Sequence, residues 1–86
     1  MGYNVTYKKS VIRDLRKFPK TEARRILDII EKELSKKTQS NPALKGRFAG
    51  LHEFWIGDYR VIYTVLGQDV LILRIGHRRD VYKSEQ

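Results

Sequence analysis

The most informative segment of the chain is residues 51–75, LHEFWIGDYRVIYTVLGQDVLILRI. Its apolar and polar side chains alternate, and two short turns, Gly57-Asp58 and Gly67-Gln68, divide it into three runs. Alternation with a period of two is typical of β-strands, and short turns containing glycine join antiparallel neighbours. The segment therefore predicts a three-stranded antiparallel meander. Its last run, Val70–Ile75, is the most apolar and is predicted to be the central strand, ended by Gly76.

The residues before the meander predict one strand and two helices. Tyr3–Tyr7 alternates in β-favouring residues and predicts a short strand. Apolar residues then recur at helical spacing up to a proline, which predicts a first helix with Ser10 as its N-cap and its end at Phe18. Thr21 is the candidate cap of a second helix over Glu22–Lys36. That helix carries the clearest apolar stripe in the chain: Ala23, Ile26, Leu27, Ile30 and Leu34.

These elements predict an α+β fold in a single domain that spans residues 1–86. Its order is an N-terminal strand, an antiparallel helical hairpin and a three-stranded antiparallel meander. The hairpin is expected because only a residue or two separates the two helices. Helices on one face of a sheet leave the other face open, and this open face is where a functional site is expected.

Composition limits the classes of function. The chain has 86 residues and a net charge of +8, which indicates a polyanionic partner. It has no cysteine, which excludes disulfides, thiolate catalysis and cysteine-type zinc sites. His52 and His77 lie far apart and lack a carboxylate cluster, so neither a metal nor another cofactor is expected. No apolar run reaches the roughly 18 residues of a membrane span, and the N-terminus has no signal-peptide pattern, so we expect no membrane contact and a cytoplasmic location.

Basic residues fall into two groups. The first lies between Lys8 and Arg25 and is opposed only by Asp14 and Glu22, so it is either a solvated helix face or a contact with a phosphate backbone. The second lies outside the helices and includes Arg60 and Arg74 within apolar strands. Such an arginine either pairs with a carboxylate, Asp58 or Glu53, or faces the open side of the sheet as a phosphate ligand. The members of the second group are Lys45, Arg47, Arg60, Arg74, Arg78, Arg79 and Lys83.

One reaction suits this inventory, namely RNA cleavage without a metal. The substrate's own 2′-hydroxyl attacks the neighbouring phosphate, so the protein supplies position, positive charge and proton transfer. Arginine is a poor acid or base but stabilises charge well. His77 is the candidate for proton transfer, because imidazole is the side chain suited to that role near neutral pH, although a lone histidine is more often structural. Tyr82 is a candidate for stacking on a base or for a hydrogen bond to a phosphate.

Several short motifs resemble those of the RelE/ParE superfamily of toxins from type II toxin–antitoxin systems. The similar residues run through most of the chain: Leu44-Lys45-Gly46, Gly50-Leu51, residues 57–63 (GDYRVIY), Ile75-Gly76-His77-Arg78 and Val81-Tyr82. The resemblance implies a compact α+β toxin domain, a neutralising antitoxin partner and an endoribonuclease that cleaves mRNA in the ribosomal A site.

The resemblance also assigns roles to individual residues. It places Arg60 at the scissile phosphate and Arg78 at the phosphate or leaving group. Tyr82 matches the aromatic residue that orients or stacks on a base. Lys45 falls on the basic position of the Leu-Lys/Arg-Gly motif, and His77 occupies a position beside Arg78 where basic residues are common in relatives.

The strand before Arg60 departs from the family pattern. Glu53 and Trp55 stand at two positions that are commonly basic in RelE-like enzymes. Glu53 is a candidate general base or a neutralising partner of Arg60, and Trp55 is a candidate for stacking on a nucleobase. The full set of expected RNA contacts is Lys45, Arg47, Trp55, Arg74, Arg79 and Lys83.

Two other functions remain open at this point. One is ParE-like inhibition of DNA gyrase without nuclease activity, and the other is RNA binding by a relative that no longer cleaves. Under either toxin hypothesis, we expect an acidic or amphipathic antitoxin segment, helical in form, against the helical hairpin or the rim of the sheet. Phe48 and Trp55 are candidate anchors for that segment or parts of the core.

Overall fold

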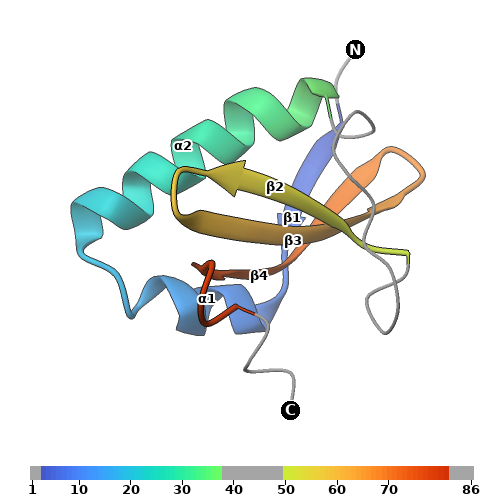
Figure 1. Cartoon of the computed structure of the whole chain (residues 1–86). Helices are drawn as coiled ribbons and strands as arrows, with labels where there is room; N and C mark the ends of the chain where they lie inside the picture. The colour runs from blue at the N-terminus through green and yellow to red at the C-terminus, as the bar shows by residue number, and fades with distance from the viewer. Residues whose placement is uncertain (1–2, 38–49, 82–86) are drawn as a thin grey trace.

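The computed structural model describes residues 3–37 and 50–81. Within these ranges the chain forms an N-terminal strand, two helices and three further strands, as predicted (Figure 1). The elements are β1 (Asn4–Tyr7), α1 (Lys9–Leu15), α2 (Lys20–Lys37), β2 (His52–Ile56), β3 (Tyr59–Leu66) and β4 (Asp69–His77).

The four strands form one mixed sheet in the order β1-β4-β3-β2. β2, β3 and β4 are successive antiparallel neighbours, which confirms the predicted meander and places β4 inside the sheet. β1 pairs with β4 in parallel, from Asn4 opposite Asp69 to Tyr7 opposite Ile72. The return from β1 to β4 thus spans most of the chain, which fits the rule that parallel neighbours need a long crossover.

Gly76 lies within β4, so the prediction that it ends this strand is wrong. The strand continues to His77, and the chain then turns back so that Val81 lies over Gly76. A Cβ atom on Gly76 would stand 3.3 Å from the Cβ of Val81, which is a tight contact. Glycine at this position therefore leaves room for the close approach of the following turn and does not end the strand.

The core lies between α2 and one face of the sheet. Ile26, Ile30 and Leu34 of α2 are fully buried, which confirms the central part of the predicted apolar stripe. They form one cluster with buried residues of β3 and β4: Val61, Tyr63, Val70, Ile72 and Ile75. Neither helix in the described part of the chain combines the length and the apolar character needed to cross a membrane.

α1 is shorter than predicted and has a different relation to the sheet. It ends at Leu15, three residues before the expected Phe18, and packs mainly along β4, whereas α2 lies over β1 and the core (Figure 1). Ser10 is not its cap. The N-cap is Lys8, which makes no side-chain capping bond, and the Ser10 hydroxyl instead donates to the carbonyl oxygen of Leu73 at 2.7 Å.

Asp14 of α1 accepts hydrogen bonds from the part of β4 that β1 does not reach. β1 stops at Tyr7, so β4 has no strand partner on this side beyond Ile72. Asp14 is 4% exposed and accepts three hydrogen bonds. Two come from Nε and Nη2 of Arg74, both at 3.0 Å, and one comes from the backbone N–H of Ile75 at 2.9 Å.

This arrangement corrects the expectation that Arg74 presents its guanidinium to a phosphate. Its side chain is only 20% exposed and forms a bidentate ion pair with Asp14. The alternative of a structural ion pair is therefore the one observed, although the partner is Asp14 and not Asp58 or Glu53.

Replacing Asp14 is expected to cost much of the stability of the fold. Asp14→Ala would leave the Arg74 guanidinium and the Ile75 N–H without their buried acceptor, at a cost of about 3–5 kcal/mol in the free energy of unfolding. Urea denaturation followed by circular dichroism measures the change. Asp28→Ala, which removes an exposed carboxylate of α2, serves as the control and should change stability by no more than about 0.5 kcal/mol. Equal effects of the two variants would contradict this role of Asp14.

A second prediction concerns alkaline pH. The Tyr7 hydroxyl donates to Oε2 of Glu31 at 2.6 Å and so links β1 to α2. Burial, and next the bond to Glu31, raise the pKa of Tyr7 well above its ordinary value. The unfolded chain therefore loses this proton first, and the stability that Tyr7 provides is complete below pH 10.0 and declines above it. The stability difference between the native chain and Tyr7→Phe should shrink from neutral pH to about pH 11. A constant difference across this range would refute the prediction.

Candidate functional site

The register of β2 and β3 shows which side chains lie on the open face of the sheet. Trp55 of β2 lies opposite Arg60 of β3, and Glu53 lies opposite Ile62, so these four side chains share one face. Val61 and Tyr63 point to the other face, where α2 covers them. Glu53, Trp55 and Arg60 are thus brought together on the face that the helices leave uncovered, as the sequence predicts for this side of the sheet.

Trp55, Glu53 and Arg60 contact one another directly. The indole Nε1 of Trp55 donates to Oε1 of Glu53 at 2.6 Å. The guanidinium carbon of Arg60 lies 4.3 Å from the centroid of the Trp55 ring, which is a cation–π arrangement. Trp55 is nevertheless 61% exposed. Glu53 therefore acts as the acceptor for the indole, and Arg60 covers one face of it.

The Arg60 side chain is also fixed from the turn between β2 and β3. Its Nη1 donates to the carbonyl oxygens of Gly57 at 2.9 Å and of Tyr59 at 3.0 Å. Both bonds use the same nitrogen, so Nε and Nη2 stay available to a ligand as far as the described residues are concerned. Gly57 has a φ of 58°, the left-handed conformation that glycine adopts without strain, and this conformation shapes the turn that carries the two carbonyls.

Arg78 approaches the same end of the sheet. Its backbone N–H donates to the carbonyl oxygen of Asp58 at 2.8 Å, which ties the residues after β4 to the β2–β3 turn. Its side-chain Nε lies 3.7 Å from Oδ1 of Asp58, and both side chains are more than half exposed. An exposed ion pair of this length contributes little to stability, so Arg78 can exchange Asp58 for a phosphate at small cost.

His77 lies on the other side of the sheet from Arg60. It pairs with Tyr59 in the register, whereas Arg60 pairs with Gly76. The Tyr59 and His77 rings meet edge to face with centroids 6.2 Å apart, and Tyr59 packs in turn on Phe18. The His77 Nδ1 accepts the backbone N–H of Arg79 at 3.1 Å. The structure therefore does not bring His77 together with Arg60 for proton transfer.

Arg79 and Arg74 are the other expected RNA contacts that the structure describes. Arg79 is exposed in the turn after β4. Arg74 is held by Asp14, as described above. The other expected contacts, Lys45, Arg47, Phe48, Tyr82 and Lys83, lie outside the described residues. Within residues 3–37 and 50–81, no group of three or more metal-ligating side chains comes together.

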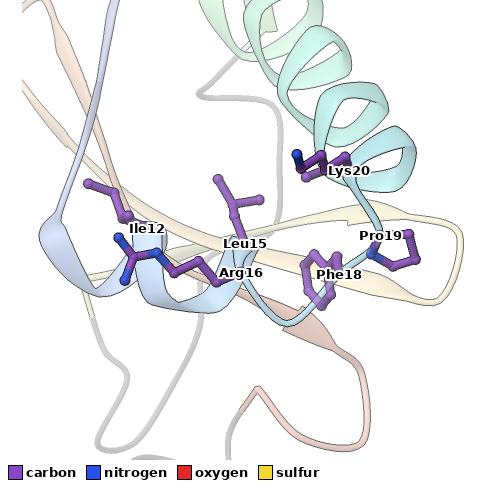
Figure 2. A pocket seen from close by; sticks show the side chains of 7 residues that line it. Ile12, Leu15, Arg16, Phe18, Pro19 and Lys20 are labelled. Carbon is purple, nitrogen blue, oxygen red and sulfur yellow. The ribbon is translucent and has the colours of Figure 1, made fainter.

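A second site, which the sequence did not indicate, is a groove between the end of α1 and the start of α2. It has a volume of about 560 Å³, and Figure 2 shows Leu15 pointing from α1 toward α2 and Arg16 lying beside Ile12. Ile12 is 52% exposed, although an apolar residue of α1 was expected to face the core. One sequence signal for this exposure exists: Val11 and Ile12 are adjacent in a helix, so only one of them can point directly into the core, and Val11 is the buried one. The lining residues are Ile12, Leu15, Arg16, Phe18, Pro19, Lys20 and Ala23.

Comparison with known proteins identifies the family. The family model described as the ParE toxin of the type II toxin–antitoxin system parDE matches residues 5–82. The chain belongs to the RelE/ParE toxin family. RelE1 of Methanocaldococcus jannaschii is 32% identical over 94 residues, covering 98% of this chain and 99% of RelE1. Toxin RelG of Mycobacterium tuberculosis is 29% identical over 86 residues, covering 96% of this chain and 99% of RelG.

Solved structures agree with this assignment. The toxin–antitoxin complex RelBE2 of Mycobacterium tuberculosis contains a chain that superposes with a TM-score of 0.84 at 27% identity, over 91% of this chain and 100% of that one. The RelE/ParE fold is therefore shared over nearly the whole chain, and the resemblance drawn from the sequence motifs is confirmed.

Proposed function

We propose that this RelE/ParE family member is the toxin of a type II toxin–antitoxin system and cleaves mRNA on the ribosome without a metal ion. The observation that carries the proposal is the convergence of Arg60 and Arg78 on the β2–β3 turn, at one end of the open face. Two relatives, RelE1 and RelG, are named as toxins, which supports the toxin role.

The two arginines suit the charge that develops in this reaction. The substrate's 2′-hydroxyl attacks the adjacent phosphorus, the bond to the following 5′-oxygen breaks, and a cyclic phosphate and a free 5′-hydroxyl result. The phosphorane carries additional negative charge, which fixed guanidinium groups stabilise. Arg60 is held by two backbone carbonyls, and Arg78 is restrained only by a long pair with Asp58. Arg60 thus positions the phosphate, and the Arg78 side chain can turn toward it.

Proton transfer has less support than charge stabilisation. Glu53, the candidate base on the open face, is hydrogen-bonded to Trp55, and His77 lies on the opposite face. The mechanism therefore depends chiefly on the positive charge of Arg60 and Arg78 and on the ribosome for the remaining alignment.

The same placement of Glu53 and His77 favours one alternative, inhibition of DNA gyrase by binding. That activity needs no acid or base at Arg60. The matched family model, which is named for ParE, also supports it.

The proposal includes an antitoxin, and the groove between α1 and α2 is its proposed docking site. RelBE2, which this chain resembles, is a toxin–antitoxin complex. The groove offers an apolar floor from Leu15, Phe18 and Ala23, with Arg16 and Lys20 among its lining residues. An amphipathic antitoxin helix with acidic residues beside its apolar stripe matches this combination.

Cleavage is expected to depend on the two arginines. Arg60→Ala combined with Arg78→Ala should reduce ribosome-dependent cleavage at least about 100-fold, because loss of a single stabilising group of this kind commonly costs that much. Primer extension on a defined mRNA with purified ribosomes measures it. Arg13→Ala combined with Arg24→Ala removes the same charge from exposed helix positions and should leave cleavage within a few fold. Undiminished cleavage by the first variant would refute the assignment of the site.

The same assay separates the two toxin activities. Cuts that appear only on ribosomes support the nuclease, whereas cuts on free mRNA indicate an RNase that works alone. If no cuts appear in either reaction and gyrase supercoiling is inhibited, the gyrase alternative replaces the nuclease.

Antitoxin binding is expected to depend on Ile12. Ile12→Asp places a carboxylate in the groove and should weaken binding of the antitoxin encoded beside this chain's gene at least about tenfold, since it adds an unpaired charge to an apolar contact. Isothermal titration calorimetry with the purified proteins gives the affinity. Leu66→Asp is the matched control, because Leu66 is an aliphatic residue of similar exposure at 59%, in the β3–β4 turn region. Equal losses in both variants would place the antitoxin elsewhere.

A further inference from the structure

Trp55 is an unusual residue to leave in solvent. It is 61% exposed and lies within β2, an edge strand of the sheet. A large aromatic side chain gains free energy when it is covered, and exposed aromatic residues that keep a polar contact are common where a ligand docks. The strand geometry gives no reason for the exposure, since the neighbouring positions Phe54 and Ile56 turn to the covered face and are more buried.

The indole is held in one orientation despite its exposure. Its N–H donates to Glu53 at 2.6 Å, and the Arg60 guanidinium lies 4.3 Å from the ring centroid. Arg60 is in turn held by the carbonyl oxygens of Gly57 and Tyr59. One face of the ring is thus occupied by a fixed cation, and its edge is anchored. The outer face of Trp55 is a flat apolar surface whose orientation is set before any ligand arrives, which lowers the entropy lost on binding.

Glu53 has a defined part in this arrangement. Side chains two residues apart on a strand point to the same face, so Glu53 and Trp55 are neighbours along β2. The carboxylate accepts the indole N–H and keeps the ring from rotating about its side-chain bonds. Glu53 is therefore a positioning residue for Trp55.

The surroundings of Trp55 match a nucleotide better than a protein segment. A nucleotide combines a flat base with a phosphate, and the open face combines a flat indole with Arg60 beneath it and Arg78 at the same end of the sheet. Only an unpaired base exposes its flat face, which points to single-stranded RNA. An apolar and acidic protein segment instead finds its match in the groove between α1 and α2.

We propose that the outer face of Trp55 stacks on one unpaired nucleobase of the RNA substrate, with Arg60 behind the ring and Glu53 fixing its orientation. The inference rests on the proposed function, because it takes RNA to be the substrate. Stacking of this kind is tolerant of sequence, so Trp55 adds affinity and places the strand, and it does not select one base by hydrogen bonds.

The chain itself provides a direct measurement, because Trp55 is its only tryptophan. Indole fluorescence is recorded while the full chain is titrated with a short single-stranded oligoadenylate. The control ligand is an abasic oligonucleotide of equal length, which keeps the phosphates and lacks the bases. The oligoadenylate is expected to quench the fluorescence to saturation, and the abasic ligand is expected to leave it nearly unchanged. The absence of quenching by oligoadenylate, or equal quenching by both ligands, overturns the proposal.

Substitutions test the same stacking by affinity. Trp55→Ala should weaken binding of the oligoadenylate, measured by fluorescence anisotropy of a labelled strand, by about five- to 150-fold, the range that one stacked base is worth. Trp55→Phe should recover most of the affinity, because it keeps an aromatic face. Leu66→Ala changes an equally exposed apolar residue elsewhere and should have no effect. An affinity that is unchanged in Trp55→Ala overturns the proposal.

The positioning role of Glu53 has its own readout. Glu53→Gln keeps an oxygen that accepts the indole N–H and should preserve both the quenching and the affinity, whereas Glu53→Ala should weaken binding and is expected to be less damaging than Trp55→Ala. Equal losses in Glu53→Gln and Glu53→Ala would overturn the role of the hydrogen bond.

The outcomes also separate this inference from the proposed function. Quenching by oligoadenylate without cleavage on ribosomes would retain the stacking site and reject the nuclease. Cleavage that is unaffected by Trp55→Ala, together with unquenched fluorescence, would retain the nuclease and reject the stacking site. Quenching by the antitoxin and not by RNA would show that Trp55 is a protein contact and would overturn the inference.

Discussion

β4 has nine residues and β1 has four, so the outer edge of β4 beyond Ile72 needs hydrogen-bond partners that are not a strand. α1 supplies them. Ser10 donates to the Leu73 carbonyl, and Asp14 accepts the Ile75 N–H and holds the Arg74 guanidinium. A buried backbone group without a partner is costly, so a strand that extends past its neighbour is stable only with such substitutes. The ion pair of Asp14 and Arg74 therefore supports the length of β4. The same pair fixes the position of α1 against β4.

The candidate site depends on that length. The far end of β4 places Gly76 opposite Arg60 and leads directly into Arg78, whose backbone N–H is tied to Asp58. A shorter β4 would leave the residues after it without this attachment to the β2–β3 turn. The same turn provides the carbonyls that orient Arg60 beside Trp55. The pair of Asp14 and Arg74 thus supports the length of β4, on which the attachment of Arg78 to the β2–β3 turn depends.

The alternating pattern predicts the meander and the position of β4 because period two reports a half-buried strand directly. The alternating pattern cannot predict where a β-bulge interrupts the alternation. In β4 the buried residues Val70, Ile72 and Ile75 are spaced by two and then by three, because the pairing shifts at the bulge opposite Ile62 and Tyr63. Unbroken alternation would have turned Arg74 toward the core. Its partner is also 60 residues away on a helix, beyond the reach of any local pattern.

The family motifs identify Arg60 and Arg78 as candidate site residues. They do not predict the orientation of the residues around these two arginines. His77 adjoins Arg78 in sequence, but it is opposite Tyr59, whereas the preceding Gly76 is opposite Arg60. Adjacent strand residues point to opposite faces, so His77 faces away from Arg60. Glu53 and Trp55 lie two residues apart and do share a face with Arg60, which spacing alone allows one to deduce once the strand is accepted. The contacts among Glu53, Trp55 and Arg60 depend on side-chain rotamers and on the conformation of the Gly57 turn. The sequence predicts neither.

The distribution of charge bears on how the proposed site would hold RNA. Arg60 and Arg78 are matched by Glu53 and Asp58, so these four side chains have no net charge. The excess positive charge of the chain lies instead between Lys8 and Arg25, where there are eight basic and two acidic residues. Both acidic residues already form ion pairs, Asp14 with Arg74 and Glu22 with Arg25. The net positive charge is therefore concentrated on the helical side of the molecule. At the open face, the proposed RNA substrate would be held by directed contacts, a phosphate on two arginines and a base on an indole. Stacking of a base on the indole would lose less to added salt than the arginine–phosphate contacts, because only the latter release counterions.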